Sequence, residues 1–535
     1  MEVKELKIEE LTVEQKIGMA MCGHIYYRWD WKEKDVNREY AINLIKERKL
    51  GAIWVDPSYH EFEKVMAEIK EAADYPILIL TDAESGLNDD DGMTIGYHNA
   101  IGTCNREESA YAFGKVTAIK ARNRGYNVVC NPILDMTNEN CTCGGTLRGI
   151  GSDKIRVSEL AAAEARGMHD GGVLTVGKHY PSAKGDPMID SHMAENVSEV
   201  TMEELIDYCL YPYLELNKKG LLDGIMTGHC RLLNVDPELP ASLSKKVIGI
   251  IRDLGFEGFA ITDALVMMGV VAKYGLDASR GMSIAGGNDL ALTWGPNKDG
   301  YESLLNAYKN GIIPDDMLNM AVKRVLDAQH KVTLLDKDAE ITDEDIENFN
   351  KLNTDGVFEK LDDGIEPKLP KDKKHFFVIF SQNENTVSNN GEVNVDTMVK
   401  SWYDPVHIEK RLKELYPDCG TRIIREYPSQ SDGYTITDRT GEYDDLVFVT
   451  FTDCKAYVGA ENFAPRVISL FKALQVTNRI STVLHFGNPF VLEDLPHISR
   501  VIIGGTSKKA IDAGIDVLSG KYPAKGSLTY NVKFK

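Results

Sequence analysis

The chain has 535 residues, of which 43% are hydrophobic and 27% charged, and its formal net charge is −21 at pH 7. This length predicts two or three domains, and the composition excludes a disordered or collagen-like protein. The acidic charge disfavours binding to phosphate backbones and to anionic lipid surfaces, so we expect neither nucleic acid nor a membrane as a partner. A neutral small molecule is the expected partner.

The N-terminus and the cysteines indicate the compartment. The first twenty residues mix Lys and Glu and lack the apolar run of a secretory signal, and no later stretch reaches the roughly 18 apolar residues of a membrane helix. The nine cysteines are an odd number and scattered, which favours reduced thiols over a disulfide framework. We therefore expect a cytoplasmic protein. The one close pair, Cys141 and Cys143, lacks the spacing and the second pair of a zinc site.

Up to residue 335, short apolar runs alternate with amphipathic helical stretches, a pattern typical of repeated βα units around a parallel sheet. Two of the predicted helices span 157–168 and 243–254, where apolar residues recur at three- and four-residue spacing. At least seven runs are visible, at 51–56, 75–84, 125–135, 172–181, 222–229, 255–263 and 285–294. The economical interpretation is an α/β fold with an N-terminal (β/α)8 TIM-like barrel over residues 1–335.

The chain changes character after the predicted barrel. Residues 336–372 lose the periodicity and gain acidic residues, Lys and Pro, so they are predicted to form an acidic surface linker with one short helix. Residues 373–535 are predicted to form a smaller α/β sandwich domain. Its expected buried strands lie at 375–381, 445–453, 480–489 and 499–505.

Polar residues end several of the barrel runs. Active sites of such barrels are built from the loops at the C-terminal ends of the strands, so these residues are the first candidates. Each of them alone is better explained as a cap or loop anchor, but several on one face favour a functional site. In chain order the candidates are Asp82, Lys178, His179, His229, Asp263 and Asp289.

Asp263 is the strongest single candidate, because it follows Phe259–Thr262, a run that is expected to be buried on both faces. A strand of this kind delivers the carboxylate rigidly to the barrel mouth, where it could serve as a nucleophile or a base. The alternative is an N-cap for the following helix.

Asp190 and His192 form a second candidate. A carboxylate two residues from an imidazole can accept the Nδ1 proton and leave Nε2 free for proton transfer, although such pairs also occur in ordinary loops. Lys178 and His179 provide two donors that could hold sugar hydroxyls or a carboxylate, and their alternative is a salt bridge at the strand end.

A rigidly held carboxylate and an oriented proton carrier are the two groups needed for displacement at an acetal carbon. In that reaction a nucleophile attacks the carbon and an acid protonates the departing oxygen. Other chemistries are poorly represented. The sequence has no phosphate loop, no H-E-x-x-H and no G-x-S-x-G. Gly149-Ile150-Gly151 contains only two of the glycines of a dinucleotide fingerprint.

At these residues the sequence resembles glycoside hydrolase family 3, specifically its β-N-acetylglucosaminidase branch. The resemblance covers nearly the whole chain and rests on four ordered motifs. The first is the stretch that opens the barrel, and the others are K-H-F-P-G followed by D-S-H, G-F-x-G-x-(I/V)-x-(S/T)-D, and A-G-x-D. They are matched by Leu11–Met19, by Lys178–Pro181 with Asp190–His192, by Gly255–Asp263 and by Ala285–Asp289, the last with one additional Gly.

The resemblance implies a role for each candidate. Asp263 would be the nucleophile that forms a covalent glycosyl-enzyme with overall retention, and His192, oriented by Asp190, would be the general acid and then the base. The minus-one sugar subsite would be formed by Asp82, Arg148, Lys178 and His179. Arg148 is placed by the stretch 147–153, which resembles an arginine-bearing loop of the family.

Three positions depart from the family pattern. The motif that commonly reads D-Q-E-G-G-R is Asp82–Leu87 here, so an arginine is absent. Ser182 stands where a Gly is expected, and one additional residue precedes Asp190. These changes surround the sugar subsite and leave Asp263 and the dyad intact, so the reaction type is better defined than the substrate.

The leading hypothesis is hydrolysis of terminal, non-reducing β-N-acetylglucosamine from small saccharides such as cell-wall (muropeptide) fragments, without a metal or organic cofactor. Phosphorolysis is an alternative, because an imidazole acid/base tolerates phosphate better than a carboxylate does. A β-glucosidase of the same family and a catalytically silent sugar-binding protein also stay open. The oligomeric state does not follow from the sequence.

Overall fold

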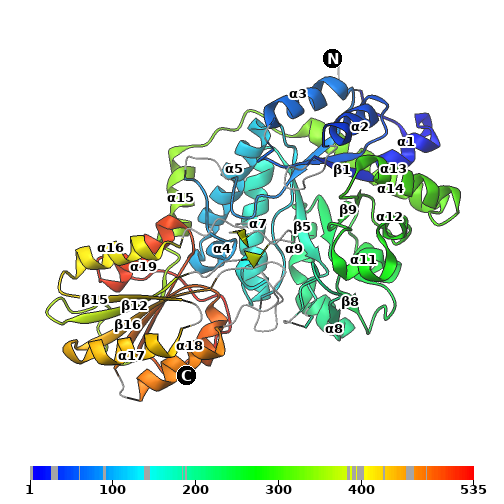
Figure 1. Cartoon of the computed structure of the whole chain (residues 1–535). Coiled ribbons are helices and arrows are strands. Elements are labelled where there is room, and N and C mark those ends of the chain that lie inside the picture. The colour runs from blue at the N-terminus through cyan, green and yellow to red at the C-terminus, as the bar shows by residue number, and fades with distance from the viewer. Residues whose placement is uncertain are drawn as a thin grey trace.

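The structure of the protein is a computed structural model, and its two main sheets are shown in Figure 1. It describes residues 4–25, 34–59, 61–87, 92–137, 145–183, 185–186, 189–381, 386–387, 393–394, 403–425, 428–452, 463–476 and 479–535. Cys141 and Cys143, the close cysteine pair, lie outside these residues.

The first sheet has eight parallel strands in the spatial order β10-β1-β2-β3-β4-β5-β7-β9. A parallel bridge between Ile261 and Leu290 joins the last strand to the first, so the sheet is a nearly closed barrel. This confirms the predicted fold class. The strands are β1 (Met21–Ile25), β2 (Ala52–Val55), β3 (Leu78–Thr81), β4 (Val128–Val129), β5 (Leu174–Tyr180), β7 (Gly224–Thr227), β9 (Phe259–Thr262) and β10 (Ala291–Leu292).

The helices surround the barrel (Figure 1), and apolar residues of these helices pack against apolar residues of the strands. The two predicted helices are confirmed as α7 (Lys154–Asp170) and α10 (Lys245–Asp253). α10 begins where the Ser244 hydroxyl accepts a hydrogen bond from the backbone of Val247, a typical N-cap. The others are α1 (Val13–Met19), α2 (Lys34–Lys46), α3 (Phe62–Ala72), α4 (Asn99–Cys104), α5 (Glu107–Asn123), α6 (Gly145–Arg148), α8 (Met202–Glu204), α9 (Tyr211–Lys218), α11 (Met268–Tyr274), α12 (Leu276–Ala285), α13 (Asn297–Lys309) and α14 (Asp315–Leu334).

The predicted linker 336–372 contains α15 (Asp343–Thr354) and β11 (Phe358–Leu361). A capping box between Thr342 and Asp345 starts α15. The helix then packs against the barrel, where Phe349 is fully buried and its ring lies 5.8 Å from that of Phe113. The domain limits at residues 335 and 373 stay a prediction, because α15 and β11 lie between them.

The second sheet has six strands in the order β11-β18-β17-β16-β12-β15, of which β11 alone runs antiparallel to its neighbour. α16 and α19 lie on one face of this sheet, and α17 and α18 lie on the other (Figure 1), and apolar residues of these helices pack against the strands. The predicted α/β sandwich is therefore present. Its elements are β12 (His375–Ser381), α16 (Pro405–Leu415), β15 (Gly420–Arg425), α17 (Gln430–Arg439), β16 (Asp445–Thr452), α18 (Pro465–Gln475), β17 (Ile480–Gly487), β18 (Arg500–Gly504) and α19 (Lys508–Leu518).

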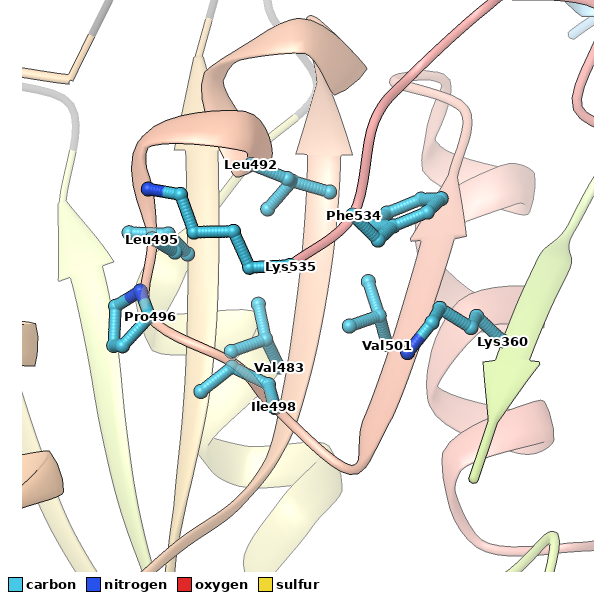
Figure 2. Close-up of a pocket in the computed structure, with 9 residues that line it drawn as sticks. All are labelled: Lys360, Val483, Leu492, Leu495, Pro496, Ile498, Val501, Phe534 and Lys535. Carbon is cyan, nitrogen blue, oxygen red and sulfur yellow. The ribbon is translucent and has the colours of Figure 1, made fainter. Parts of the chain in front are cut away.

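Two pairs of very short strands and a small pocket complete the description. The pairs are β6 (Val197–Ser198) with β8 (Arg231–Leu232), and β13 (Thr386–Val387) with β14 (Val393–Asn394), while β4 joins the barrel through two residues only. Figure 2 shows the pocket over β17 and β18 of the second sheet, where Phe534 and Lys535 lie beside Val483, Leu492 and Val501. Apart from Lys360 and Lys535 its lining is apolar, and it shares no residue with the candidates for chemistry.

Replacing Phe349 with Ala is expected to lower the free energy of unfolding by about 3 to 5 kcal/mol, because the change removes a fully buried ring and leaves a cavity between α15 and α5. Urea unfolding followed by circular dichroism measures the loss. The matched control is Ile346→Ala on the same helix, whose side chain is 37% exposed and whose change is expected to cost about 0.5 kcal/mol or less. Equal losses for the two variants would contradict a structural role for this face of α15.

Candidate active site

Asp263 directly follows β9, all of whose residues are buried. Its backbone N–H donates to the carbonyl of Thr227 (2.9 Å), and its Oδ1 accepts from the backbone N–H of Ala264 (2.7 Å). Asp263 does not cap the next helix, because α11 begins at Met268 and its N-cap residue is Met267. The carboxylate is therefore held at the barrel mouth by a rigid strand.

Asp263 is ionised at neutral pH. Burial opposes its ionisation, but the neighbouring imidazoles of His179, His229 and His192 and the backbone N–H of Ala264 lower the pKa of Asp263 to about 2. The carboxylate is thus negatively charged and close to three imidazoles, one of which belongs to the predicted dyad.

The predicted dyad is formed. The Nδ1–H of His192 donates to Asp190 Oδ1 over 2.8 Å, and the backbone N–H of His192 donates to the same oxygen over 2.9 Å. Asp190 is 7% exposed. Burial opposes protonation of His192, but the hydrogen bond and charge of Asp190, followed by the charge of Asp263, raise the pKa of His192 above its usual value. The bond also fixes the tautomer, so Nε2 points away from Asp190.

The dyad loop is docked onto the helix that follows Asp263. The backbone N–H groups of Met268 and Gly269 donate to the carbonyls of His192 (3.1 Å) and Ser191 (2.9 Å). A Cβ at position 269 would lie 2.9 Å from the carbonyl of Ser191, so only glycine permits this approach. These backbone bonds place the dyad at the start of α11, a few residues beyond Asp263.

A carboxylate that the sequence did not single out joins the predicted sugar-binding residues. Glu84 accepts from Arg148 through Nε (2.8 Å) and a terminal nitrogen (2.6 Å), and its Oε1 lies 2.6 Å from Lys178 Nζ. Lys178 also donates to Asp82. Burial favours the protonated acid, but Arg148 and Lys178 hold the pKa of Glu84 well below its usual range.

His179 is held in the same network from the other side. Its backbone N–H and its Nδ1–H donate to Asp135, at 3.1 and 2.7 Å. Its Nε2 lies 3.2 Å from a terminal nitrogen of Arg148, which has only donors, so Nε2 accepts. Asp135 ends the third apolar run, so the strand-end rule could have found it. Glu84 lies two residues beyond Asp82, inside the motif that named Asp82.

Two other strand-end candidates have different positions. His229 is buried, with its Nδ1 2.8 Å from the Ser242 hydroxyl and its Nε2 3.1 Å from the carbonyl of Ala264, so it holds the backbone next to Asp263. Burial lowers the pKa of His229.

Asp289 precedes β10 and accepts from Arg252 (2.7 Å) and from the backbone of Ala260 at the start of β9. Asp289 therefore lies at the opposite end of the barrel, and as a site candidate it is wrong.

Ser182 explains one departure from the expected motif. Its backbone φ is 58°, in the left-handed region that glycine adopts most easily. Its hydroxyl accepts a hydrogen bond from the backbone N–H of Met136 over 2.8 Å. This bond, which a glycine could not make, ties the end of β5 to the segment that follows Asp135.

Within the described part of the chain, we find no group of three or more His, Cys, Asp or Glu side chains that could hold a metal ion. Nor is any helix in that part both long and apolar enough to cross a membrane. The contacts described above form two charged groups of residues, the Asp263 carboxylate with its dyad and the network around Glu84.

Comparison with known proteins identifies the family of the barrel domain. The sequence profile of the glycosyl hydrolase family 3 N-terminal domain matches residues 5–328. A β-hexosaminidase of Idiomarina loihiensis is 27% identical over 286 residues, which cover 52% of this chain and 84% of the relative. One from Pseudomonas aeruginosa is 34% identical over 190 residues, covering 35% of this chain and 56% of the relative.

Solved structures share the whole fold. The family 3 β-N-acetylglucosaminidase of Paenibacillus sp. FPU-7 superimposes with a TM-score of 0.77 at 24% identity, covering 98% of this chain and all of that one. A β-glucoside phosphorylase superimposes with a TM-score of 0.78 at 22% identity, covering 99% and 98% of the two chains. The profile match, which covers more than half of the chain, shows that the chain belongs to glycosyl hydrolase family 3, and with the β-hexosaminidase relatives it shows a glycosidase.

Replacing Glu84 with Gln is expected to lower kcat/KM on the order of 10-fold to 100-fold, because one oxygen that binds Lys178 and Arg148 becomes an amide donor and both cations shift. Steady-state kinetics with a chromogenic β-glycoside measures the loss. The control is Glu359→Gln, which alters a similar contact with Arg500 in the second sheet and is expected to leave kcat/KM unchanged. A normal kcat/KM for the Glu84 variant would contradict the role of this network.

Proposed function

We propose that the protein is a retaining glycosidase that releases terminal, non-reducing β-N-acetylglucosamine from small saccharides such as cell-wall fragments. The observation that carries the proposal is the hydrogen bond between His192 and Asp190, in a loop docked beside the residues that follow Asp263. An oriented imidazole next to an ionised carboxylate is the pair that acetal chemistry needs. The names of the relatives, which are β-hexosaminidases, support the choice of sugar.

In the first step, an oxygen of Asp263 attacks the anomeric carbon while Nε2–H of His192 protonates the glycosidic oxygen. The bond between the anomeric carbon and the leaving oxygen breaks, and the sugar is left covalently bound to Asp263. The low pKa of Asp263 keeps the nucleophile ionised, and the raised pKa of His192 favours the protonated acid.

In the second step, Nε2 of His192 takes a proton from a water molecule, whose oxygen attacks the anomeric carbon and displaces Asp263. Two displacements at the same carbon give net retention. During both steps the network around Glu84 would hold the sugar hydroxyls through Lys178, Arg148 and His179. Asp82 would accept hydrogen bonds from these hydroxyls.

With 4-nitrophenyl β-N-acetylglucosaminide in phosphate buffer, the purified protein is expected to release 4-nitrophenol and free N-acetylglucosamine, identified by mass. Asp263→Asn is expected to reduce the rate by several orders of magnitude, because the covalent route is lost. The matched control is Asp289→Asn, at the opposite end of the barrel; where this variant folds, it is expected to keep the activity. If the protein turned over 4-nitrophenyl β-glucoside faster than the N-acetylglucosaminide, that result would contradict the proposed sugar.

A second candidate is phosphorolysis by the same residues. The imidazole of His192 carries no negative charge in its basic form, so it does not repel a phosphate dianion as a carboxylate would. The experiment above separates the two reactions, because phosphorolysis would yield N-acetylglucosamine 1-phosphate and its rate would depend on the phosphate concentration. The absence of this product would exclude it.

The alkaline limb of the pH profile of kcat/KM is expected to report the loss of the His192 proton, at a pH above the usual histidine value. In Asp190→Asn the carboxylate that raises the pKa of His192 is absent, so the acid form is lost at lower pH. We expect this limb to move to lower pH. Kinetics between pH 5 and pH 9 measure the shift.

The matched control for this experiment is Asp512→Asn. Asp512 accepts from His407 Nε2 over 2.9 Å in the second domain, so the variant removes a similar pair outside the barrel. Its pH profile is expected to be unchanged. If the alkaline limb of Asp190→Asn stayed where it is in the parent enzyme, a group other than His192 would carry that limb.

A further inference from the structure

Arg148 lies at the end of α6, a helix of one turn, and the next four residues form no helix or strand. One side of this turn is anchored inside the barrel domain. The Nδ1–H of His98 donates to the carbonyl of Arg148 (3.2 Å), and His98 Nε2 lies 2.8 Å from Glu164. Both side chains are fully buried. The backbone of Arg148 is thus fixed from within.

The other side of the turn contacts residues from the far end of the sequence. We call Ser527–Tyr530, which follow the second sheet, the returning segment. The backbone N–H of Ser152 donates to the carbonyl of Thr529 (2.8 Å), and the Thr529 hydroxyl donates to the carbonyl of Ile150 (2.9 Å). The Tyr530 hydroxyl donates to the carbonyl of Gly149 (3.3 Å). Every residue from 149 to 152 except Gly151 is therefore bonded to this segment.

Gly151 is part of the contact in a different way. A Cβ at this position would lie 2.8 Å from the Cβ and the carbonyl oxygen of Thr529. A Cβ at Gly102, in α4, would lie 1.8 Å from the carbonyl oxygen of Ile150 and 2.7 Å from the Thr529 hydroxyl. The close approach of these three segments therefore requires both glycines. This explains Gly151 in the Gly-Ile-Gly sequence, which fits no dinucleotide site.

The loop after Glu84 also rests on residues beyond the barrel. Asn353 of α15 donates to the carbonyl of Thr94 (3.2 Å) and accepts from the Ser507 hydroxyl, which lies between β18 and α19. A Cβ at Gly96 would lie 2.0 Å from the Thr506 hydroxyl. Both partners of the Glu84–Arg148 ion pair are thus followed by loops that pack against the second domain.

We propose that the returning segment is a positioning element of the sugar-binding site, through which the second domain fixes Arg148. Its hydroxyl groups hold the carbonyls of Gly149 and Ile150, while His98 holds that of Arg148. The guanidinium is then presented to Glu84, His179 and the sugar in one orientation. This proposal rests on the proposed function, since it needs Arg148 to bind the substrate.

The test combines Thr529→Val with Tyr530→Phe in the full chain, which removes both hydroxyl donors and keeps the ring and nearly the same volume. With 4-nitrophenyl β-N-acetylglucosaminide, kcat/KM is expected to fall about 10-fold, mainly through a higher KM, because the sugar loses a positioned ligand. Thr529→Ser keeps the hydroxyl and is expected to stay within about two-fold of the parent. Should Thr529→Val fail to fold, Tyr530→Phe alone serves as the variant.

A double-mutant cycle separates positioning from general stability. In an Arg148→Met background, the same pair of changes is expected to alter kcat/KM by less than about two-fold, because the side chain that the segment positions is absent. The matched control, Lys525→Met, removes a contact with Asp355 near α15 instead of the turn after Arg148, and is expected to have no effect on KM. An equal loss in both backgrounds would overturn the proposal.

Hydrogen exchange gives a readout that does not depend on activity. Exchange of the Ser152 amide is expected to be about ten times faster in the double variant, because the segment whose Thr529 carbonyl accepts from this amide loses both hydroxyl contacts to the turn. If the parent enzyme turned over no glycoside, the proposed function would fail and exchange alone would test the segment. Unchanged exchange would overturn its role whatever the activity.

Discussion

The ion pairs of Glu84 determine the arrangement of the proposed sugar-binding side of the barrel mouth. One carboxylate binds both Arg148 and Lys178, which come from the loop after β4 and from β5, while Glu84 itself follows β3. Two cations that face the same space repel each other, and at low dielectric this repulsion is large. A shared carboxylate offsets it, and removing such a partner leaves uncompensated buried charge. Three neighbouring strands are therefore coupled through one side chain.

The two groups of candidate residues are supported in different ways. Asp263 is held directly by the backbone of β9 and by its bond to Ala264. His192 belongs to an irregular loop, and its position depends on two backbone bonds to the start of α11 and on the Asp190 carboxylate. The nucleophile candidate is thus fixed by secondary structure, whereas the proton carrier is fixed by tertiary contacts. Changes in this loop would alter the proton carrier without moving Asp263.

The barrel, the second sheet and most of the polar residues at the strand ends could be predicted from the sequence, because buried parallel strands are near-continuous apolar runs. β1 was missed because Met21–Ile25 contains Gly and His and has one β-branched residue. Glu84 could not be assigned a partner, since its partners lie 64 and 94 residues away in the sequence. Asp289 was misplaced because an apolar run alone does not show where within it the strand begins.

The bond between Thr529 and Ile150 joins residues that are 379 positions apart. During synthesis the barrel residues leave the ribosome first, and domains generally fold in that order. The turn after Arg148, however, lacks its partner until the ribosome has passed residue 530. A nascent chain with a folded barrel would therefore carry the dyad and Asp263 before the turn beside Arg148 has acquired its last contacts. Completion of this side of the mouth is coupled to the end of translation of the second domain.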